Sequence, residues 1–252
     1  MGKKKSRKRN LIIEGFKKLD YLYSKLPETK GCFENLNKCK GKCCLYQNPQ
    51  VFYVEFLNIW TYICKNWNIE DLLKIIELSV RTYVYNTPTK GCIFFDKEKY
   101  LCRIHNKRPF NCFFYGITPP EEFNKRYEKI KKLYKNNPDA IFMEQCNLIK
   151  AYSNGKEKIV SQEEIDNWWK ELVEIEHYIG VKKKNINDEE EGSYRTFHDH
   201  ILLKIMPHEV LIELEKIRMM KNINSKDIVI KTFIKLLKEN IEKIKNAGKE
   251  KS

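Results

Sequence analysis

Glycine is scarce in this chain, with ten among 252 residues, and the common motifs that depend on glycine are missing. There is no glycine-rich phosphate-binding loop, no nucleophile elbow and no HExxH motif. A Rossmann motif of the kind that binds S-adenosylmethionine is absent as well. This last absence weighs against a self-contained methyltransferase, and none of the other common catalytic signatures offers a reaction in its place.

Long apolar runs are also lacking. A secretory signal needs an apolar stretch of about 7–15 residues after its basic start, but Leu11-Ile12-Ile13 is followed at once by Glu14. No uninterrupted run approaches the roughly 18–20 apolar residues that are needed to cross a bilayer. We therefore expect no transmembrane segment and a cytoplasmic location.

Charge, in contrast, is abundant and unbalanced. Lysine and arginine number 48 against 34 acids, which gives a formal net charge of +14. The first ten residues hold six of these cations and no acid, so we expect a disordered basic tail over residues 1–10. Such a tail favours a polyanionic partner, RNA or DNA or an acidic membrane surface. A genome bias toward Lys, Asn and Ile codons is an equally good origin of the charge, and no protein partner is indicated.

Hydrophobic periodicity predicts a mainly α fold. Helices are expected over residues 11–26, 51–67, 68–85, 161–180 and 225–246, with one more after Pro207. Ser161 and Glu164 form a capping box, and Ser225 is the predicted N-cap of the last helix. Residues 31–48 are predicted to be a loop, and residues 92–104 a small β-hairpin. We expect a cysteine-cluster metal-binding domain over residues 11–155 and a helical C-terminal region over residues 156–252.

The nine cysteines are the chain's strongest chemical signal. A reducing compartment keeps thiols free, so grouped cysteines in such a chain are more often metal ligands than disulfide partners. Eight of them fall into two polar groups and are the predicted ligands: Cys32, Cys39, Cys43, Cys44, Cys92, Cys102, Cys112 and Cys146. The close spacing of Cys39, Cys43 and Cys44 lets one loop bring several sulfurs to one metal, and neighbouring lysines lower thiol pKa values. Thiolates suit both zinc and iron–sulfur clusters.

Other candidates receive less weight. Cys64 lies in an aromatic run and is predicted to be a buried core residue. His105 is expected beside the ligands or on the surface, and His198-Asp199-His200 in a solvated turn. Arg108-Pro109 is expected to shape a loop, and its guanidinium could donate to a cluster sulfide or an anionic ligand.

At these cysteines the sequence resembles the YkgJ-like CxxCxxCC cysteine-cluster proteins, a putative zinc- or iron-chelating domain. The resemblance is carried by Cys92-Ile-Phe-Phe, by Leu101-Cys102-Arg-Ile-His105 and by Arg108-Pro109-Phe-Asn-Cys112, in that order. Cys43-Cys44 matches the double cysteine of the motif. Cys32 and Cys39 match the preceding pair at wider spacing, six and three intervening residues instead of two and two, and Cys146 matches the eighth family cysteine. The resemblance covers about residues 30–150.

Flagellin lysine-N-methylases are similar in the first part of the motif and are linked to an iron–sulfur cluster. This resemblance implies an iron–sulfur cofactor, of the [4Fe-4S] type, with Zn²⁺ as the alternative. Three functions stay open: a metal-binding protein, a cluster-dependent enzyme that modifies protein lysine or RNA, and a zinc-stabilised nucleic-acid-binding module.

Overall fold

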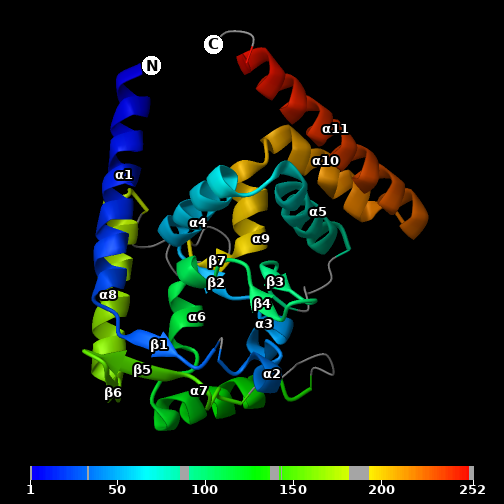
Figure 1. Ribbon diagram of the computed structural model, residues 1–252. Coiled ribbons are helices and arrows are strands. Elements are labelled where there is room, and N and C mark those ends of the chain that lie inside the picture. The colour runs from blue at the N-terminus through cyan, green and yellow to red at the C-terminus, as the bar shows by residue number, and fades with distance from the viewer. Residues whose placement is uncertain are drawn as a thin grey trace. The chain divides into compact units, whose positions relative to one another are not determined.

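The computed structural model describes residues 2–32, 34–85, 91–136, 142, 144–181 and 193–249, and its secondary structure is drawn in Figure 1. The fold is mainly α, as predicted, with only short antiparallel strands. The chain forms two compact units, one of Met1–Ile59 with Lys90–Arg195 and one of Trp60–Thr89 with Thr196–Ser252. These units do not coincide with a division at residue 155, because the helix that follows this position packs within the first unit.

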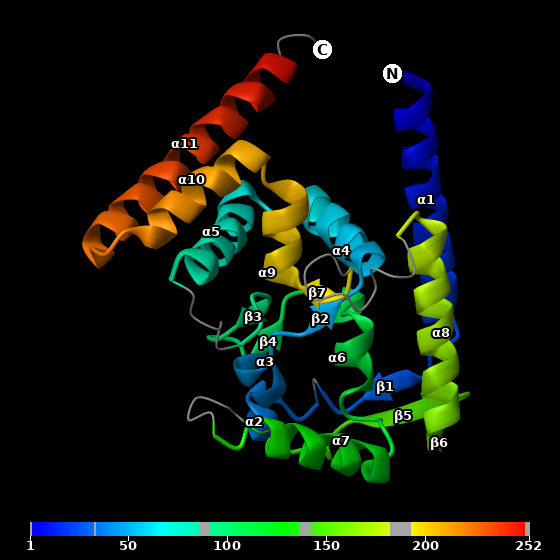
Figure 2. The same cartoon turned by 180° about the vertical axis from the view of Figure 1, so that it is seen from behind.

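Two long helices form one side of the first unit. α1 (Gly2–Ser24) and α8 (Gln162–Tyr178) lie side by side, as Figure 1 and the opposite view in Figure 2 both show. Leu19 and Leu22 of α1 and Leu172 of α8 are almost fully buried in their shared core. The Ser161 hydroxyl accepts from the backbone N–H of Glu164, which confirms the predicted capping box at the start of α8.

The helix α1 begins earlier than the sequence pattern suggested. Residues 2–10 are helical, where a disordered tail was expected. Lysine and arginine are good helix formers, so a basic segment can continue a helix without an apolar face of its own. Across the described ranges, no helix is both long and apolar enough to cross a bilayer.

A small antiparallel sheet in the first unit was not predicted. Its strands are β1 (Glu28–Lys30), β5 (Lys150–Ser153) and β6 (Lys156–Lys158), in the order β1-β5-β6. Lys30 pairs with Lys150 in this register. These strands are polar and short, so they carry no alternating apolar pattern from which a strand could be recognised.

The cysteine segments are more ordered than a loop. Short helices α2 (Leu36–Cys39) and α3 (Lys42–Tyr46) replace the loop expected over residues 31–48. The predicted hairpin is confirmed, as β3 (Phe95–Asp96) and β4 (Leu101–Cys102) pair antiparallel with Phe95 opposite Cys102. The elements that complete the unit are β2 (Gln50–Val51), the 3-10 helix η1 (His105–Lys107), α6 (Phe110–Phe114) and α7 (Pro120–Leu133).

The second unit is helical. α4 (Tyr53–Asn66) begins in the first unit and ends in the second, and β7 (Arg195–Thr196) lies where the chain returns to it. Within the second unit, α5 (Ile69–Tyr85) packs against α10 (His208–Met219) and α11 (Ile223–Lys249). α9 (Phe197–His200) and the π-helical turn η3 (Ile201–Ile205) also contact α5.

The two predicted starts of helices in this unit had different outcomes. Asn68 caps α5, because its side-chain oxygen accepts from the backbone N–H of Asp71 at 2.8 Å. The prediction that Ser225 is the N-cap of α11 was wrong. The side-chain oxygen of Asn222 accepts from the Ser225 backbone N–H at 3.1 Å, so the helix starts three residues earlier. Asn and Ser are both good N-cap residues, so the sequence allowed either start, and in the folded chain Asn222 is the cap.

Candidate metal centre

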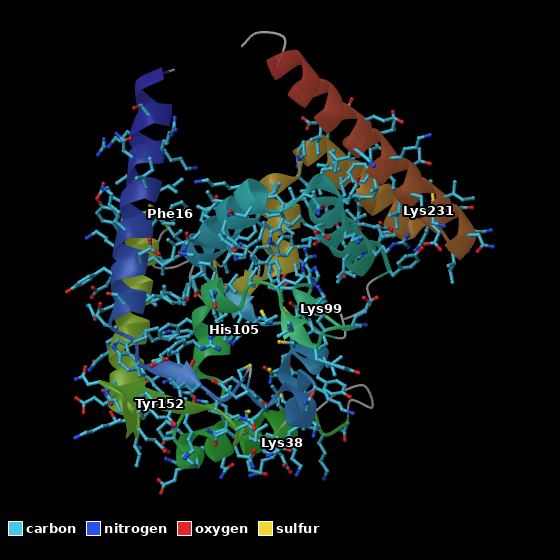
Figure 3. All side chains as sticks on the ribbon, in the orientation of Figure 1. Phe16, Lys38, Lys99, His105, Tyr152 and Lys231 are labelled. Carbon is cyan, nitrogen blue, oxygen red and sulfur yellow. The ribbon has the colours of Figure 1, made fainter. Side chains whose placement is uncertain are left out.

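All eight predicted ligands lie in the first unit, on short elements or in the turns between them. Cys43 and Cys44 lie on α3, Cys102 on β4 and Cys112 on α6. The eight side chains are free thiols of intermediate burial. Figure 3 labels Lys38, Lys99 and His105, which stand on the same segments as Cys39, Cys102 and the Arg108-Pro109 step.

One set of contacts ties the double cysteine to the hairpin. The backbone N–H of Cys92 donates to the carbonyl of Cys44 at 2.7 Å. This approach requires a glycine before Cys92, since a Cβ on Gly91 would lie 2.7 Å from the same carbonyl oxygen, and its φ is +97°. The Cys92 carbonyl accepts from the N–H of Phe95, which pairs with Cys102 across the hairpin. Cys44, Cys92 and Cys102 are thereby held together by the backbone.

A second set of contacts brings the two outermost cysteines together. Strands β1 and β5 end their pairing at Lys30 and Lys150, two residues before Cys32 and four after Cys146. Gly31 lies directly against the Leu148 carbonyl, to which a Cβ would approach within 1.9 Å. The sequence alone offered no sign of this proximity, because it depends on pairing between strands about 120 residues apart.

The double cysteine carries the closest sulfur contact. The Sγ atoms of Cys43 and Cys44 are 3.9 Å apart. A hydrogen bond with Cys44 lowers the pKa of Cys43 to about 7, and another lowers the pKa of Cys102. The pKa of Cys44 itself is strongly raised, first by its hydrogen bonds with Cys102 and Cys43. A thiolate is the form that binds metal.

Burial, and after it the charge of neighbouring thiols, raises the pKa of Cys32, Cys92, Cys112 and Cys146. Burial, and then the charges of Cys43, Cys39 and Cys146, raise the pKa of Cys32 to about 11. Burial, followed by the charge of Cys102, raises the pKa of Cys92 to about 12. Cys112 and Cys146 have raised pKa values for the same two reasons. Thiolates that repel one another are the arrangement that a multivalent cation stabilises, because its charge removes the repulsion.

Arg108 supplies the fixed positive charge of this region. Its guanidinium contacts His105 Nε2 at 2.8 Å and donates to the Thr29 hydroxyl. Its charge acts to lower the pKa of Cys43 and Cys102, and to offset the rise at Cys32. Arg108 therefore does more than shape the loop at Pro109. His105 contacts this arginine, and burial with the nearby guanidinium lowers its pKa to about 4.

These residues suit a metal because of their sulfur donor atoms, although the side chains do not already surround a site for one ion. Across the described ranges, no three Cys, His, Asp or Glu side chains form a ready-made site for one ion. The donor set itself fits zinc or iron, since both take thiolate sulfur from cysteine. Eight thiols that lie within electrostatic range of one another, with one arginine among them, have the composition of such a centre.

Two predictions about other residues were wrong. Cys64 is exposed and not part of the core. Its neighbour Ile63 is fully buried, and successive residues of a helix point about 100° apart, so α4 turns Cys64 outward. His198 and His200 are 1% and 0% exposed, where a solvated turn was expected. Thr196 and Asp199 form a capping box that starts α9 there, and His198 Nδ1 lies 3.1 Å from the Ser79 hydroxyl.

A buried carboxylate behind the cysteines was missed. Glu55 is 3% exposed and accepts three hydrogen bonds, from the Tyr23 hydroxyl at 2.7 Å and from the backbone N–H groups of Phe110 at 2.7 Å and Phe52 at 3.0 Å. It thus joins α1 and the starts of α4 and α6. Burial raises its pKa, against the effect of these donors. The signal in the sequence was an acid inside the apolar run Val51–Trp67.

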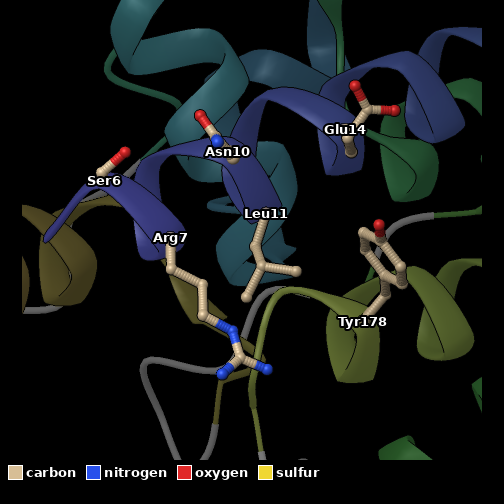
Figure 4. Close-up of a pocket in the computed structure, with 6 residues that line it drawn as sticks. All are labelled: Ser6, Arg7, Asn10, Leu11, Glu14 and Tyr178. Atoms are coloured by element: carbon tan, nitrogen blue, oxygen red, sulfur yellow. The ribbon is translucent and has the colours of Figure 1, made fainter. Parts of the chain in front are cut away.

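The first unit contains several pockets, among them the following two. A surface pocket of about 360 Å³ between α1 and α8 contains no cysteine (Figure 4). A second pocket of about 320 Å³ is lined mainly by aromatic rings of α6, α7 and α8, together with Gln47 and Tyr115. Tyr115 joins this aromatic pocket to the thiols, because burial and then the charges of Cys43, Cys146 and Cys39 raise its pKa to about 12.

Comparison with protein families identifies the cysteine segment. Residues 32–147 match the model of the CxxCxxCC family, described as a putative zinc- or iron-chelating domain. The resemblance seen in the motif is thereby confirmed over these residues. The description supports metal binding and names both zinc and iron. No curated protein and no solved structure matches the chain.

Proposed function

We propose that the chain holds an iron–sulfur centre of the [4Fe-4S] type on its eight clustered cysteines. The observation that carries the proposal is that thiols from residues 32 to 146 gather in one unit and raise or lower one another's pKa. When bound, such a centre would supply one-electron redox chemistry or an iron atom that binds substrate. Free thiols and thiolate ligands both fit the reducing cytoplasm.

Spacing favours iron–sulfur over zinc. Structural zinc sites are commonly built from pairs of cysteines with about two to four residues between them. Here only Cys39 has such spacing, to Cys43 and to Cys44, whereas nine residues separate Cys92 from Cys102 and nine more separate Cys102 from Cys112. A larger centre can reach ligands from separate segments, which is the arrangement of β3, β4 and α6.

Metal analysis of the anaerobically purified chain tests this proposal. We expect a brown protein whose absorption spectrum shows sulfide-to-iron charge transfer, with iron and acid-labile sulfide in equal amounts. Zinc without iron would contradict the iron–sulfur assignment and leave zinc as the bound metal. Cys102→Ala should lower the metal content, and Cys64→Ala, the matched control on α4, should leave it unchanged.

The aromatic pocket favours a second candidate, a cluster-dependent enzyme that modifies protein lysine or RNA. Tyr115 lines this pocket and feels the charges of Cys43, Cys146 and Cys39. The pocket is large enough for a small side chain or base. An enzyme of this kind needs an open coordination position on its metal. A change in the electron paramagnetic resonance spectrum of the reduced protein on adding a substrate peptide or oligonucleotide would support this candidate. A spectrum that no substrate alters would count against it.

The basic start of α1 favours a third candidate, a zinc-stabilised module that binds nucleic acid. Arg7, Lys8 and Arg9 are exposed on the helix. This candidate requires a colourless protein and a binding constant for RNA or DNA that falls steeply with salt. Iron and sulfide in the purified protein would exclude it.

A further inference from the structure

One wall of the aromatic pocket is formed by rings of α7. Phe123 and Tyr127 are four residues apart on this helix, and their ring planes differ by 18° with centroids 6.1 Å apart. Tyr115 meets the Phe123 ring at 80°, and Phe142 meets the Tyr127 ring at 82°. The wall therefore presents two nearly parallel faces, each with a roughly perpendicular ring beside it. Such faces favour a flat, aromatic ligand, which can stack on them.

Polar side chains stand among these rings. Asn111 lines the pocket, and its Nδ2 donates to the Gln50 carbonyl at 2.8 Å and to the Tyr194 hydroxyl. These two bonds hold the amide in place and use its donors, so its Oδ1 is the group that can accept from a ligand N–H. Gln47 also lines the pocket. An apolar cavity with a few positioned polar groups is typical of a binding site for a small, partly polar ring.

Arg126 adds a positive charge to the same pocket. It lines the cavity and is exposed to solvent. No carboxylate in the described part of the chain forms an ion pair with it, whereas its neighbour Lys125 pairs with Glu122 at 2.6 Å. A guanidinium of this kind can bind a phosphate through two parallel hydrogen bonds. The same charge repels an ammonium group, so it disfavours a lysine side chain as the occupant.

Positive charge continues along α7 past the pocket. Lys129 and Lys132 follow Arg126 at intervals of three residues, and both are exposed. At 1.5 Å per residue, Arg126 and Lys132 are about 9 Å apart along the helix axis. Lys131 adds a further cation, with its Nζ 5.7 Å from the centroid of the Tyr127 ring. A free mononucleotide would leave most of this row unused, whereas a strand with successive phosphates could use all of it.

We infer that the aromatic pocket binds one unpaired base of a single-stranded nucleic acid, whose phosphates lie on Arg126 and on the lysines of α7. Aromatic stacking combined with a basic track is the general way in which single strands are bound. The inference rests on the second candidate function, for which it names nucleic acid as the ligand, but binding itself requires no metal. A bound base would lie beside Tyr115, whose hydroxyl donates to the Glu144 carbonyl at 2.7 Å, two residues before Cys146.

Variants of the full chain test the stacking wall. Binding of a fluorescein-labelled oligouridylate is measured by fluorescence anisotropy, in parallel with the deoxy version of the same strand. We expect Tyr127→Ala to weaken binding about tenfold, because one stacked base loses its partner. Tyr127→Phe keeps the ring and should bind as the wild type does. Binding that Tyr127→Ala leaves unchanged, or failure of both strands to bind the wild type, would overturn the inference. The tighter of the two strands tells RNA from DNA.

The salt dependence of the same binding tests the phosphate contact. Arg126→Gln alters an exposed side chain and should reduce the slope of log K against log salt by about 0.7, the value for one phosphate of a single strand. The matched control is Lys125→Gln, the neighbouring cation that already has a carboxylate partner. Its effect on the slope should be smaller. Equal effects of the two variants would show general attraction to a basic helix and would overturn the assignment of Arg126.

Crosslinking of the wild-type chain avoids any effect of substitution on folding. An oligouridylate that carries one 4-thiouridine is irradiated with the protein, and mass spectrometry locates the crosslinked peptides. Crosslinks should fall on α6, α7 and α8, whose side chains line the pocket. Crosslinks confined to α1 would overturn the inference and leave the basic start of that helix as the contact. A short lysine peptide should not compete with the strand, and competition by it would return the pocket to a lysine substrate.

The metal content of the same preparations separates this inference from the proposed function. Tyr127→Ala and Arg126→Gln should keep the metal of the wild type, because neither residue is a predicted ligand. A chain that binds the strand at this pocket but holds no metal would refute the proposed metal centre alone. A metal-loaded chain whose binding is unaffected by both variants would refute the base pocket alone.

Discussion

The substitution Glu55→Gln is the sharpest test of how the fold supports the metal centre. The carboxylate accepts two hydrogen bonds at Oε1, from the Tyr23 hydroxyl and the Phe110 N–H, and one at Oε2 from the Phe52 N–H. An amide can keep its oxygen on the Oε1 side. Its NH₂ group then faces the N–H of Phe52, so one buried donor loses its acceptor and a second buried donor is added.

The expected cost follows from these contacts. Leaving a buried polar group unsatisfied costs about 1–3 kcal/mol, and the whole free energy of unfolding of a domain is about 5–15 kcal/mol. We therefore expect Glu55→Gln to lower the free energy of unfolding by about 2 kcal/mol, measured by urea denaturation of the metal-free protein at pH 7. Tyr23→Phe removes one bond and leaves the backbone donors paired, so its effect should be smaller, about 1 kcal/mol.

The metal centre should respond to the same substitution. The Phe110 N–H that Glu55 accepts is at the start of α6, two residues before Cys112. Looser anchoring of α6 should make the metal-loaded variant release its metal to a chelator faster than Tyr23→Phe does. A urea midpoint equal to that of the wild type, or metal release no faster than in Tyr23→Phe, would refute the anchoring role of Glu55.

The contribution of Glu55 to the free energy of unfolding should also depend on pH. Burial raises its pKa in the folded state, so the folded chain holds this proton more tightly than the unfolded chain does. Stability from this group is therefore greatest at low pH and falls as pH rises from the unfolded value of about 4.3 toward the folded value. Glu55→Gln should remove this slope.

Three further predictions concern other parts of the chain. Burial lowers the pKa of His198 to about 4, so its contribution to stability, at most about 3 kcal/mol, is present above pH 6.5 and lost as pH falls through 4. His198→Asn should therefore narrow the difference between the free energies of unfolding measured in urea at pH 7 and at pH 4.5. An unchanged difference would contradict the prediction. Gly31→Ala should lower the free energy of unfolding by more than about 2 kcal/mol and reduce the metal content, because the new Cβ meets a backbone carbonyl. Gly155→Ala, with φ +76° and open space around it, should cost only the left-handed backbone strain of about 1 kcal/mol. Equal effects of the two variants in thermal unfolding would be inconsistent with the close approach at Gly31. Deletion of residues 2–10 should weaken binding to single-stranded RNA and flatten its salt dependence, and unchanged binding would remove α1 as the contact.

The sequence by itself determined the features that depend on neighbours along the chain. The capping box at Ser161, the cap at Asn68 and the hairpin that ends at Cys102 are formed by residues within a few positions of one another. The family of residues 32–147 was recognisable for the same reason, since Cys92 to Cys112 form a continuous motif. Local geometry fixes these features because their partners are set by spacing alone.

Only the tertiary structure decided which distant groups meet. Polar strands of three and four residues bring Cys32 to Cys146, and no apolar pattern announced them. Glu55 accepts from Tyr23 of α1, from Phe110 of α6 and from Phe52 just before α4, so its role depends on packing as much as on its place in an apolar run. The faces of α4 and α9 likewise decided that Cys64 is exposed and that His198 is buried. The cysteines could be predicted from the sequence as metal ligands, but the approach of the segments that carry Cys32 and Cys146 arises from pairing across about 120 residues, which local propensity does not encode.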